Sequence, residues 1–382
     1  MKKLTALLII TAILLSTPSY LLAENENVLT WQKAYTLLNK NSSVLSDLSE
    51  AEQERRKQYE EASAEAKNID TKGRTINILG NEIRIGYDEA TQMLMTQQKE
   101  LYPEQMRFYW NVSQDTLKRT ANSLVISLRS LYLGMYNAHI NVKIKERKYE
   151  IARNLNDQNK LRLEKGMISE LDALESAYNL DRAKAELEAA KRNRENILRS
   201  LNLFLNQEIS TDYDDIMPES QYYTSLRGFD YYLERALTYR AEIKQAEKQL
   251  VLLKKKKDIM ERFPLSMNTI SIRKDYNNLL LDIEIQEAKL EQAMIDIEAE
   301  VKEAYVEAAS AVKNMENMKK LFEIQKSNIE KIRKMYEKGM ISKTALDQAE
   351  ISYQEFCSSY DMTLFDCNTK LMKLIFKSGT GI

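Results

Sequence analysis

One six-residue sequence, Glu-Lys-Gly-Met-Ile-Ser, occurs twice in the chain, at 164–169 and at 337–342. In each copy a glycine that can end one helix is followed by a serine that can begin the next. Each copy also lies between two long stretches in which apolar residues recur at heptad spacing, as they do in coiled coils. The repeat therefore predicts two antiparallel helical hairpins that arose by internal duplication.

The two turns are expected to be alike at the glycine and different after the serine. Ser169 is a predicted N-cap, and Asp172, three residues later, would complete a capping box. In the second copy Ala345 stands at the position of Asp172, so the box is expected to be missing there. Ile341 and Leu346 could form a hydrophobic staple at that helix start.

Apolar seams cover most of the chain. They predict a helix from about 112 to 165 with a return helix at 170–205, then a seam over 290–336 with a return helix at 343–376. The chain has only nine Gly and four Pro among 382 residues, which favours long helices over a sheet protein with many turns. The expected fold class is therefore mainly α, with two long antiparallel coiled-coil hairpins.

The duplication also sets the expected domain boundaries. Residues 1–23 have a short basic start and an apolar core, as in a secretory signal peptide. The first helical repeat is expected at 24–205 and the second at 229–376. Between them, 206–228 lack periodicity and are predicted to form a linker, and 377–382 are predicted to be a frayed tail.

One short stretch has the period of a β-strand instead of a helix. Apolar residues alternate over 75–87 around a Gly-Asn pair, which predicts a β-hairpin. Its strands would have about four or five residues, whereas a membrane-spanning strand needs about 9–11. A weaker alternation at 265–273 is ambiguous. Residues 88–110 are predicted to be helical, with an interruption at Pro103.

An aromatic group in the same region, Phe108 to Trp110, is expected to pack in a core, with a membrane interface as the alternative. The run Lys254 to Lys257 is predicted to be a solvated helix end, or else a contact with an anionic membrane or wall polymer. No stretch after the leader is apolar enough for a transmembrane helix. The formal net charge of −1 gives no basic surface for nucleic acid.

Residues that carry chemistry are sparse. The single histidine, His139, is expected to be solvated on a charged helix face. Cys357 and Cys367 would lie about 15 Å apart in one helix, too far for a disulfide, and are expected to be buried apolar residues. The sequence has no phosphate-binding loop, metal motif or nucleophile elbow. We therefore expect neither an enzyme nor a bound cofactor or metal.

These features together resemble the TolC-like outer-membrane efflux family, over about 29–376. The resemblance depends on their order: Leu29, Thr30 and Ala34 at the start, a restart at 240–247, and two Glu-Lys-Gly-x-Ile-Ser copies next to Leu-Asp-Ala-Leu and Ala-Leu-Asp-Gln-Ala-Glu. Proteins of this family are trimers. Their strands close a 12-stranded outer-membrane barrel, and their helices form a periplasmic tunnel whose tip meets an adaptor protein and an inner-membrane pump.

The resemblance also implies roles for particular residues. The hairpin-tip gate, which is also the partner-docking site, would comprise Gly166, Met167, Ser169, Asp172, Tyr336, Gly339, Met340 and Ser342. Asp172 and Tyr336 match members of the network that holds the family's tip closed. The chain departs from the family pattern at Ile341, Ala345 and Gln348, where charged residues are expected, and in its barrel, for which it offers at most a short hairpin.

The resulting hypothesis is an exported envelope component of an efflux or secretion system, a passive conduit gated at its hairpin tips. It would be a homotrimer, located in the outer membrane by resemblance. The alternative is an exported coiled-coil spacer or adaptor without a pore. A weaker option is a module that binds membrane or cell-wall surfaces through Lys254 to Lys257.

Overall fold

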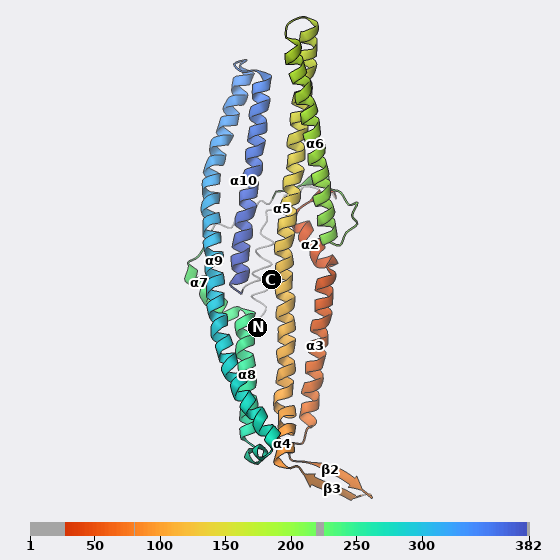
Figure 1. Cartoon of the computed structure of the whole chain (residues 1–382), viewed down its shortest axis with the longest axis vertical. Helices are drawn as coiled ribbons and strands as arrows, with labels where there is room; N and C mark the ends of the chain where they lie inside the picture. The colour runs from red at the N-terminus through yellow and green to blue at the C-terminus, as the bar shows by residue number, and fades with distance from the viewer. Residues whose placement is uncertain (1–26, 80, 219–224, 380–382) are drawn as a thin grey trace. The chain divides into compact units, whose positions relative to one another are not determined.

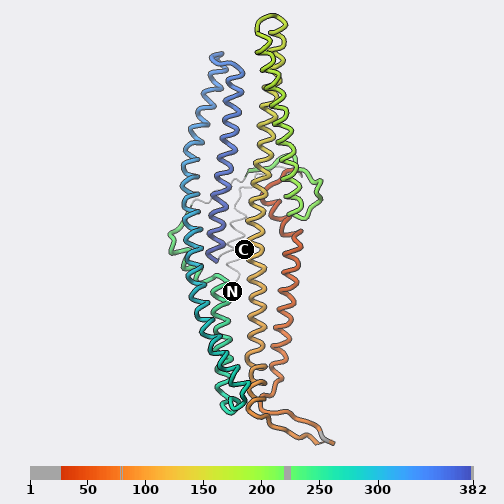
Figure 2. The backbone as a smooth tube through the Cα atoms, viewed as in Figure 1, coloured from red at the N-terminus to blue at the C-terminus, as the bar shows by residue number. Residues whose placement is uncertain are grey.

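The computed structural model of the chain describes residues 27–79, 81–218 and 225–379. Most of these residues are helical, as predicted. The long helices are α5 (Tyr102–Glu164), α6 (Glu170–Phe204), α9 (Ile270–Glu337) and α10 (Lys343–Lys377). Figure 1 shows α6 beside α5 and α10 beside α9, and Figure 2 follows the backbone through the tight turn of each pair. The two predicted antiparallel hairpins are therefore present.

The described elements fall into two compact units. Among the described residues, the first contains 27–42, 124–218, 225–226 and 306–372, and the second contains 43–79, 81–123, 227–305 and 373–379. Helices α5, α9 and α10 contribute residues to both units. Each unit therefore combines segments from both halves of the duplicated sequence.

In the first unit the helices enclose a small aromatic centre. Helix α2 (Trp31–Asn41) follows the short strand β1 (Val28–Leu29), which pairs in parallel with β4 (Asp215–Ile216). The fully buried Tyr132 of α5 stacks on Phe365 of α10 at a centroid distance of 5.9 Å. The guanidinium of Arg129 lies 4.8 Å from the Trp31 ring and 4.5 Å from the Phe365 ring. These contacts join α2, α5 and α10.

The second unit has its own apolar core. The helices of this unit are α3 (Ser43–Asn68), α4 (Glu89–Thr96), α7 (Phe229–Tyr239), α8 (Ala241–Glu261) and parts of α5, α9 and α10. Leu252, Ile259 and Met260 of α8 pack with Met93 of α4 and Leu279 of α9. Arg262, just after α8, donates to Glu100 at 2.7 Å across this core. The sequence periodicity alone did not indicate this packing.

The predicted β-hairpin belongs to the second unit. Strands β2 (Gly73–Ile78) and β3 (Asn81–Gly86) pair antiparallel, with Ile76 opposite Ile83. Each strand has six residues, and β3 is exposed along its whole length. The second weak alternation is not a strand: 264–268 form a 3₁₀ turn, η2 (Pro264–Asn268), and α9 begins at Ile270.

The predicted interruption at Pro103 is a π-helical turn, η1 (Gln97–Leu101). The backbone N–H of Tyr102 donates to the carbonyl of Gln97 there, and α5 continues directly from Tyr102. A wider turn accommodates the N–H that proline lacks, so the helix is not broken. The expected helix start near 112 was therefore ten residues too late.

Several expectations concern the ends and joints of the chain. The predicted signal peptide, 1–23, lies outside the described residues. The linker contains β4, and its residues 219–224 are also outside them. Ser378 and Gly379 are not frayed, because their N–H groups bond to the carbonyls of Leu374 and Phe376. Among the described residues, no helix has the length and apolar character that a membrane span needs.

Side chains with predicted surroundings also have defined places. Cys367 is buried and Cys357 half-buried, and no disulfide joins them. Trp110 stacks on Tyr59, and Phe108 packs on the core of the second unit, whereas Tyr109 is exposed. The lysine run lies in the last turns of α8, and three of its members pair with acids: Lys254 with Glu287, Lys255 with Glu104 and Lys257 with Glu261.

Candidate functional site: the tips of the two helical hairpins

Both hairpins turn through the same backbone motif. Gly166 and Gly339 each have φ of 68°, in the left-handed region that glycine adopts without strain. The N–H of Gly166 donates to Leu163 O at 2.8 Å, and that of Met167 donates to Arg162 O at 2.8 Å. Gly339 and Met340 make the equivalent bonds, to Tyr336 O and Met335 O. This Schellman motif satisfies the last helix carbonyls, and it confirms the turns predicted from the repeated sequence.

The helix starts after the turns differ, also as predicted. Ser169 and Asp172 form a complete capping box at the start of α6. The hydrogen bonds from the Ser169 hydroxyl and backbone N–H lower the pKa of the Asp172 carboxyl. At the start of α10, Ser342 Oγ accepts the N–H of Ala345 at 3.2 Å, and no carboxylate returns the bond. One tip therefore has a stronger helix cap than the other.

The residues expected to form a closing network do not meet. Asp172 bonds to Ser169 in its own hairpin, and Tyr336 lies under the Lys343 ammonium, 5.6 Å from its ring centroid, in the other. The ion pair that joins the two hairpins near the tips is Arg147 of α5 with Asp347 of α10, at 2.7 Å. Asp347, whose side chain is 11% exposed, also pairs with Lys343 at 3.0 Å.

A row of polar contacts continues this connection along α5 and α10. Lys148 pairs with Glu355 at 2.8 Å, and the Tyr136 hydroxyl donates to the carboxylate of Asp361. Further along, Arg129 Nε donates to the Thr369 hydroxyl at 2.9 Å. Burial raises the pKa of Asp361, and the hydrogen bond from Tyr136 only partly offsets this effect. Heptad patterns do not reveal which polar residues of two helices meet, so the sequence did not indicate this row.

The interior of each hairpin, by contrast, is apolar. In the first, Val142 of α5 packs against Leu187 and Ala190 of α6. In the second, the Phe322 ring of α9 lies 4.5 Å from the ring of Tyr360 of α10, centroid to centroid. Apolar contacts thus pack inside each hairpin, together with the Lys145–Glu186 pair across the first, and the polar row joins α5 to α10 toward the tips.

The register of the polar row makes the first hairpin extend further than the second. Thirty residues separate Tyr136 from Gly166, whereas twenty-two separate Gly339 from Asp361. A difference of eight helical residues corresponds to about 12 Å. Figure 1 shows the α5–α6 turn beyond the α9–α10 turn. The last two turns of the first hairpin therefore have no neighbouring hairpin beside them.

This extension and the helical turn next to it carry an exposed apolar row, which we call the tip stripe: Met167, Leu171, Leu174 and Tyr178. Their exposed fractions are 64%, 73%, 69% and 67%. Leu171, Leu174 and Tyr178 are three and four residues apart, which places them on one face of α6, and Met167 lies in the turn just before that helix. Single exposed apolar residues are ordinary, but a continuous row at heptad spacing is typical of an interaction surface.

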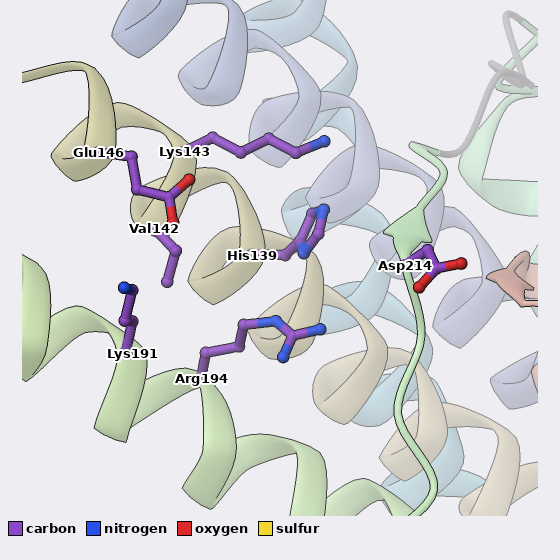
Figure 3. Close-up of a pocket in the computed structure, with 7 residues that line it drawn as sticks. All are labelled: His139, Val142, Lys143, Glu146, Lys191, Arg194 and Asp214. Atoms are coloured by element: carbon purple, nitrogen blue, oxygen red, sulfur yellow. The ribbon is translucent and has the colours of Figure 1, made fainter. Parts of the chain in front are cut away.

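His139 was predicted to be solvated, and this was wrong: it is 6% exposed. Its Nε2 lies 2.9 Å from Asp215 Oδ1, and Figure 3 shows it among charged side chains of α5 and α6. The linker residues around Asp215 cover a helix face that its charged neighbours had marked as solvent-facing. Helical periodicity cannot indicate such a cover, because the linker has no period of its own.

The described residues offer little for catalysis or metal binding. No group of three or more His, Cys, Asp or Glu side chains among them is arranged to hold a metal ion. The tips contain exposed apolar side chains, capped helix starts and ion pairs. Exposed apolar side chains grouped in this way are typical of interaction surfaces.

The comparisons with known proteins concern the fold. Neither protein-family models nor curated proteins give a match to the sequence. Solved structures do match. An outer membrane channel of Campylobacter jejuni, CmeC, has 13% identity and a TM-score of 0.59, over 92% of this chain and 86% of that one. The open-state MtrE outer membrane channel of Neisseria gonorrhoeae has 15% identity and a TM-score of 0.59, over 92% and 89%. A membrane protein of Pseudomonas aeruginosa has 12% identity and a TM-score of 0.59, over 92% and 90%. The chain thus has a TolC-like fold.

Proposed function

We propose that this chain is an exported, non-enzymatic envelope component of an efflux or secretion system, in which it forms a passive conduit gated at its hairpin tips. The observation that carries the proposal is the fold, which the chain shares over about nine-tenths of its length with outer membrane channels. The duplicated hairpins make up most of that fold, and they are the part of it that the sequence predicts most clearly.

The tip stripe is the proposed docking surface for a partner. Each of its four apolar side chains is about two-thirds exposed. Exposed acids flank the stripe at Glu170, Asp172 and Glu175. An amphipathic helix with an apolar heptad seam and basic flanking residues would match this surface in shape and in charge. A periplasmic adaptor protein, itself attached to an inner-membrane pump, is the kind of partner that we propose.

The polar row between α5 and α10 is the proposed moving joint. The Arg147–Asp347 and Lys148–Glu355 pairs exchange contacts with water more readily than an apolar seam does, because their charged ends are partly solvated. Each hairpin keeps its apolar interior when such pairs open. We propose that partner binding at the tip stripe shifts the hairpins along this joint and so opens the conduit.

The first test is the solution mass of residues 24–382, measured by light scattering with and without detergent. A conduit requires a stable trimer, and the trimer would then be tested for ion conductance in planar bilayers. A monomer or dimer in the absence of detergent would contradict the conduit as the resting state.

An exported coiled-coil spacer is the alternative. The six-residue strands β2 and β3 favour it, because a strand that crosses a bilayer needs about 9–11 residues. A spacer predicts neither a trimer nor conductance. The two measurements therefore separate the two functions.

The docking surface has a separate test. In the double variant Leu171→Asp/Leu174→Asp, carboxylates replace two exposed leucines, so the fold and the mass should not change. We expect dye efflux from cells that carry this variant in place of the natural chain to fall by about tenfold or more, because apolar anchors dominate such interfaces. The matched control is Thr344→Asp, at the position of the second hairpin that corresponds to Leu171. Equal efflux by both variants would exclude the tip stripe as the docking surface.

A further inference from the structure

The linker after the first hairpin is attached to that hairpin by four polar side chains. From α6, Arg194 donates to Asp212 Oδ1 at 2.7 Å and to Tyr213 O at 2.8 Å. From α5, Lys143 Nζ and His139 Nε2 both lie 2.9 Å from the same oxygen, Asp215 Oδ1. The Tyr132 hydroxyl donates to Met217 O at 2.7 Å. We call linker residues 212–217, held in this way, the latch segment.

His139 is the one member of this attachment that can change its charge near neutral pH. It is 6% exposed, yet it borders a hollow of about 390 Å³ that Lys143, Glu146, Lys191, Arg194 and Asp214 also line. Figure 3 shows the imidazole between the charged side chains of α5 and the latch segment. A proton can therefore reach the ring from the hollow although the ring itself is buried.

The surroundings of His139 oppose a second positive charge. Burial lowers the pKa of its imidazole, and Lys143 and Arg194 lower it further. Asp215 acts in the opposite direction. Burial would raise the pKa of the Asp215 carboxyl, but hydrogen bonds from Lys143 and from the Ile216 N–H lower it overall. Asp215 therefore stays ionised, and its charge is largely balanced by Lys143 before His139 is protonated.

The other charged side chains around the hollow are mostly acidic. Helix α5 contributes Glu146, α6 contributes Lys191, and the latch segment contributes Asp212 and Asp214. Asp212 is held by Arg194. On the side of α10, Asp361 accepts the Tyr136 hydroxyl, and burial raises the pKa of Asp361. The carboxylate that contacts the ring, Asp215, already accepts from Lys143, and Asp212 and Asp361 accept from Arg194 and Tyr136.

We propose that His139 makes the attachment of the latch segment sensitive to pH, holding it at neutral pH and releasing it in mild acid. The neutral ring donates one hydrogen bond to Asp215. Protonation adds a buried charge beside two cations and a second N–H that needs an acceptor. This inference holds for either function proposed above, because it concerns only the first unit.

The direction of the effect follows from proton binding. The folded state binds the proton on His139 less tightly than the unfolded state does, whose ordinary pKa is about 6.5. The contribution of His139 to the attachment is therefore complete above about pH 7, and it decreases as the pH falls below about 6.5. The loss is complete once the pH is below the pKa of the folded state.

The chain offers an unusually direct test because His139 is its single histidine. In protein prepared without a histidine tag, the imidazole signal in an NMR titration reports this residue alone. We expect a pKa below about 6.5 in the natural chain, a higher pKa in Lys143→Met and a lower one in Asp215→Asn. A value at or above the ordinary one in the natural chain would overturn the proposal, as would an unchanged value in Lys143→Met.

Hydrogen exchange tests the release itself. After correction for intrinsic exchange, amides of 212–217 should lose protection between about pH 7 and pH 5 in the natural chain. His139→Gln can keep an amide N–H near the position of Nε2 and does not titrate, so its protection should not change over that range. The same pH-dependent loss in His139→Gln would refute the proposal. If that variant does not fold, the Lys143→Met titration still decides it.

Discussion

The two hairpins share one turn sequence, but they present different surfaces. Gly166 and Gly339 have the same φ, and their turns have the same hydrogen bonds. Beyond the turns, Leu174 of the first hairpin is 69% exposed, whereas Asp347 at the corresponding position of the second is 7% exposed and bonded to Arg147. Tyr178 is 67% exposed, and its counterpart Ile351 is 2% exposed.

The difference shows how a duplicated element can acquire two roles. In the second hairpin the residues after the turn contact α5 and so fix the register of the two hairpins. In the first hairpin the same positions lie beyond that contact and are free to bind something else. The backbone motif is the same in both copies because each hairpin needs the same tight turn.

The largest effect should come from the seam inside the first hairpin. Leu187→Ala removes a buried side chain that packs on Val142 and Ala190, and should lower the free energy of unfolding by about 3 kcal/mol. Leu174→Ala, in the tip stripe of the same helix, should change it by less than about 0.5 kcal/mol. Urea unfolding followed by far-ultraviolet circular dichroism measures both. Equal losses of unfolding free energy in the two variants would mean that Leu174 is buried in solution, which would contradict an exposed tip stripe.

A smaller effect should follow from breaking the ion pair near the tips. Asp347→Ala removes the nearer carboxylate of Arg147, which keeps only Glu150 at 3.6 Å, and also removes the partner of Lys343, so we expect the free energy of unfolding in urea to fall by about 2 kcal/mol. Asp172→Ala, in the exposed cap of the first hairpin, should cost less. A larger loss of unfolding free energy in Asp172→Ala than in Asp347→Ala would contradict this difference between the two hairpins.

The two turn glycines should respond alike. A Cβ at either position meets no atom within 4 Å, so the cost of alanine is only that of the left-handed backbone. Gly166→Ala and Gly339→Ala should each lower the unfolding free energy by about 1 kcal/mol. A clear difference between them, measured in the same unfolding experiment, would show that the tips are not equivalent at the backbone.

The smallest effect should distinguish the two caps. Ser169→Ala removes a complete capping box and should cost about 1 kcal/mol, whereas Ser342→Ala removes a single hydrogen bond and should cost about 0.5 kcal/mol. Differential scanning calorimetry of the two variants is sensitive enough. The reverse order would contradict the difference between the caps.

Much of the fold could be predicted because its signals are local. The heptad seams, the repeated turn and the capping serine act within a few residues of one another, and all three are where the sequence indicated. The error at His139 occurred because a distant segment, the linker, covers that residue. The weak alternation left 265–273 ambiguous; η2 and the start of α9 lie there, and Met267 and Ile272 pack on the core of the second unit. The late helix start near 112 has a local cause, the π-helical turn before Pro103.

The candidate site divides in the same way. The turn residues Gly166, Met167, Gly339 and Met340 were predicted correctly as turns, and their role in docking stays a prediction. The joint between α5 and α10 was not predicted, because Arg147 and Asp347 lie 200 positions apart in the sequence. Nothing in either local pattern marks one as the partner of the other.

The sequence by itself determined that this chain forms two helical hairpins with apolar seams, and where each hairpin turns. Those features depend on spacing along one helix, which the order of residues specifies directly. Only the tertiary structure decided which hairpin extends further, which apolar row remains exposed and that the single histidine is buried. Those features depend on the register between helices far apart in the chain, which a set of side-chain contacts fixes only after the chain has folded.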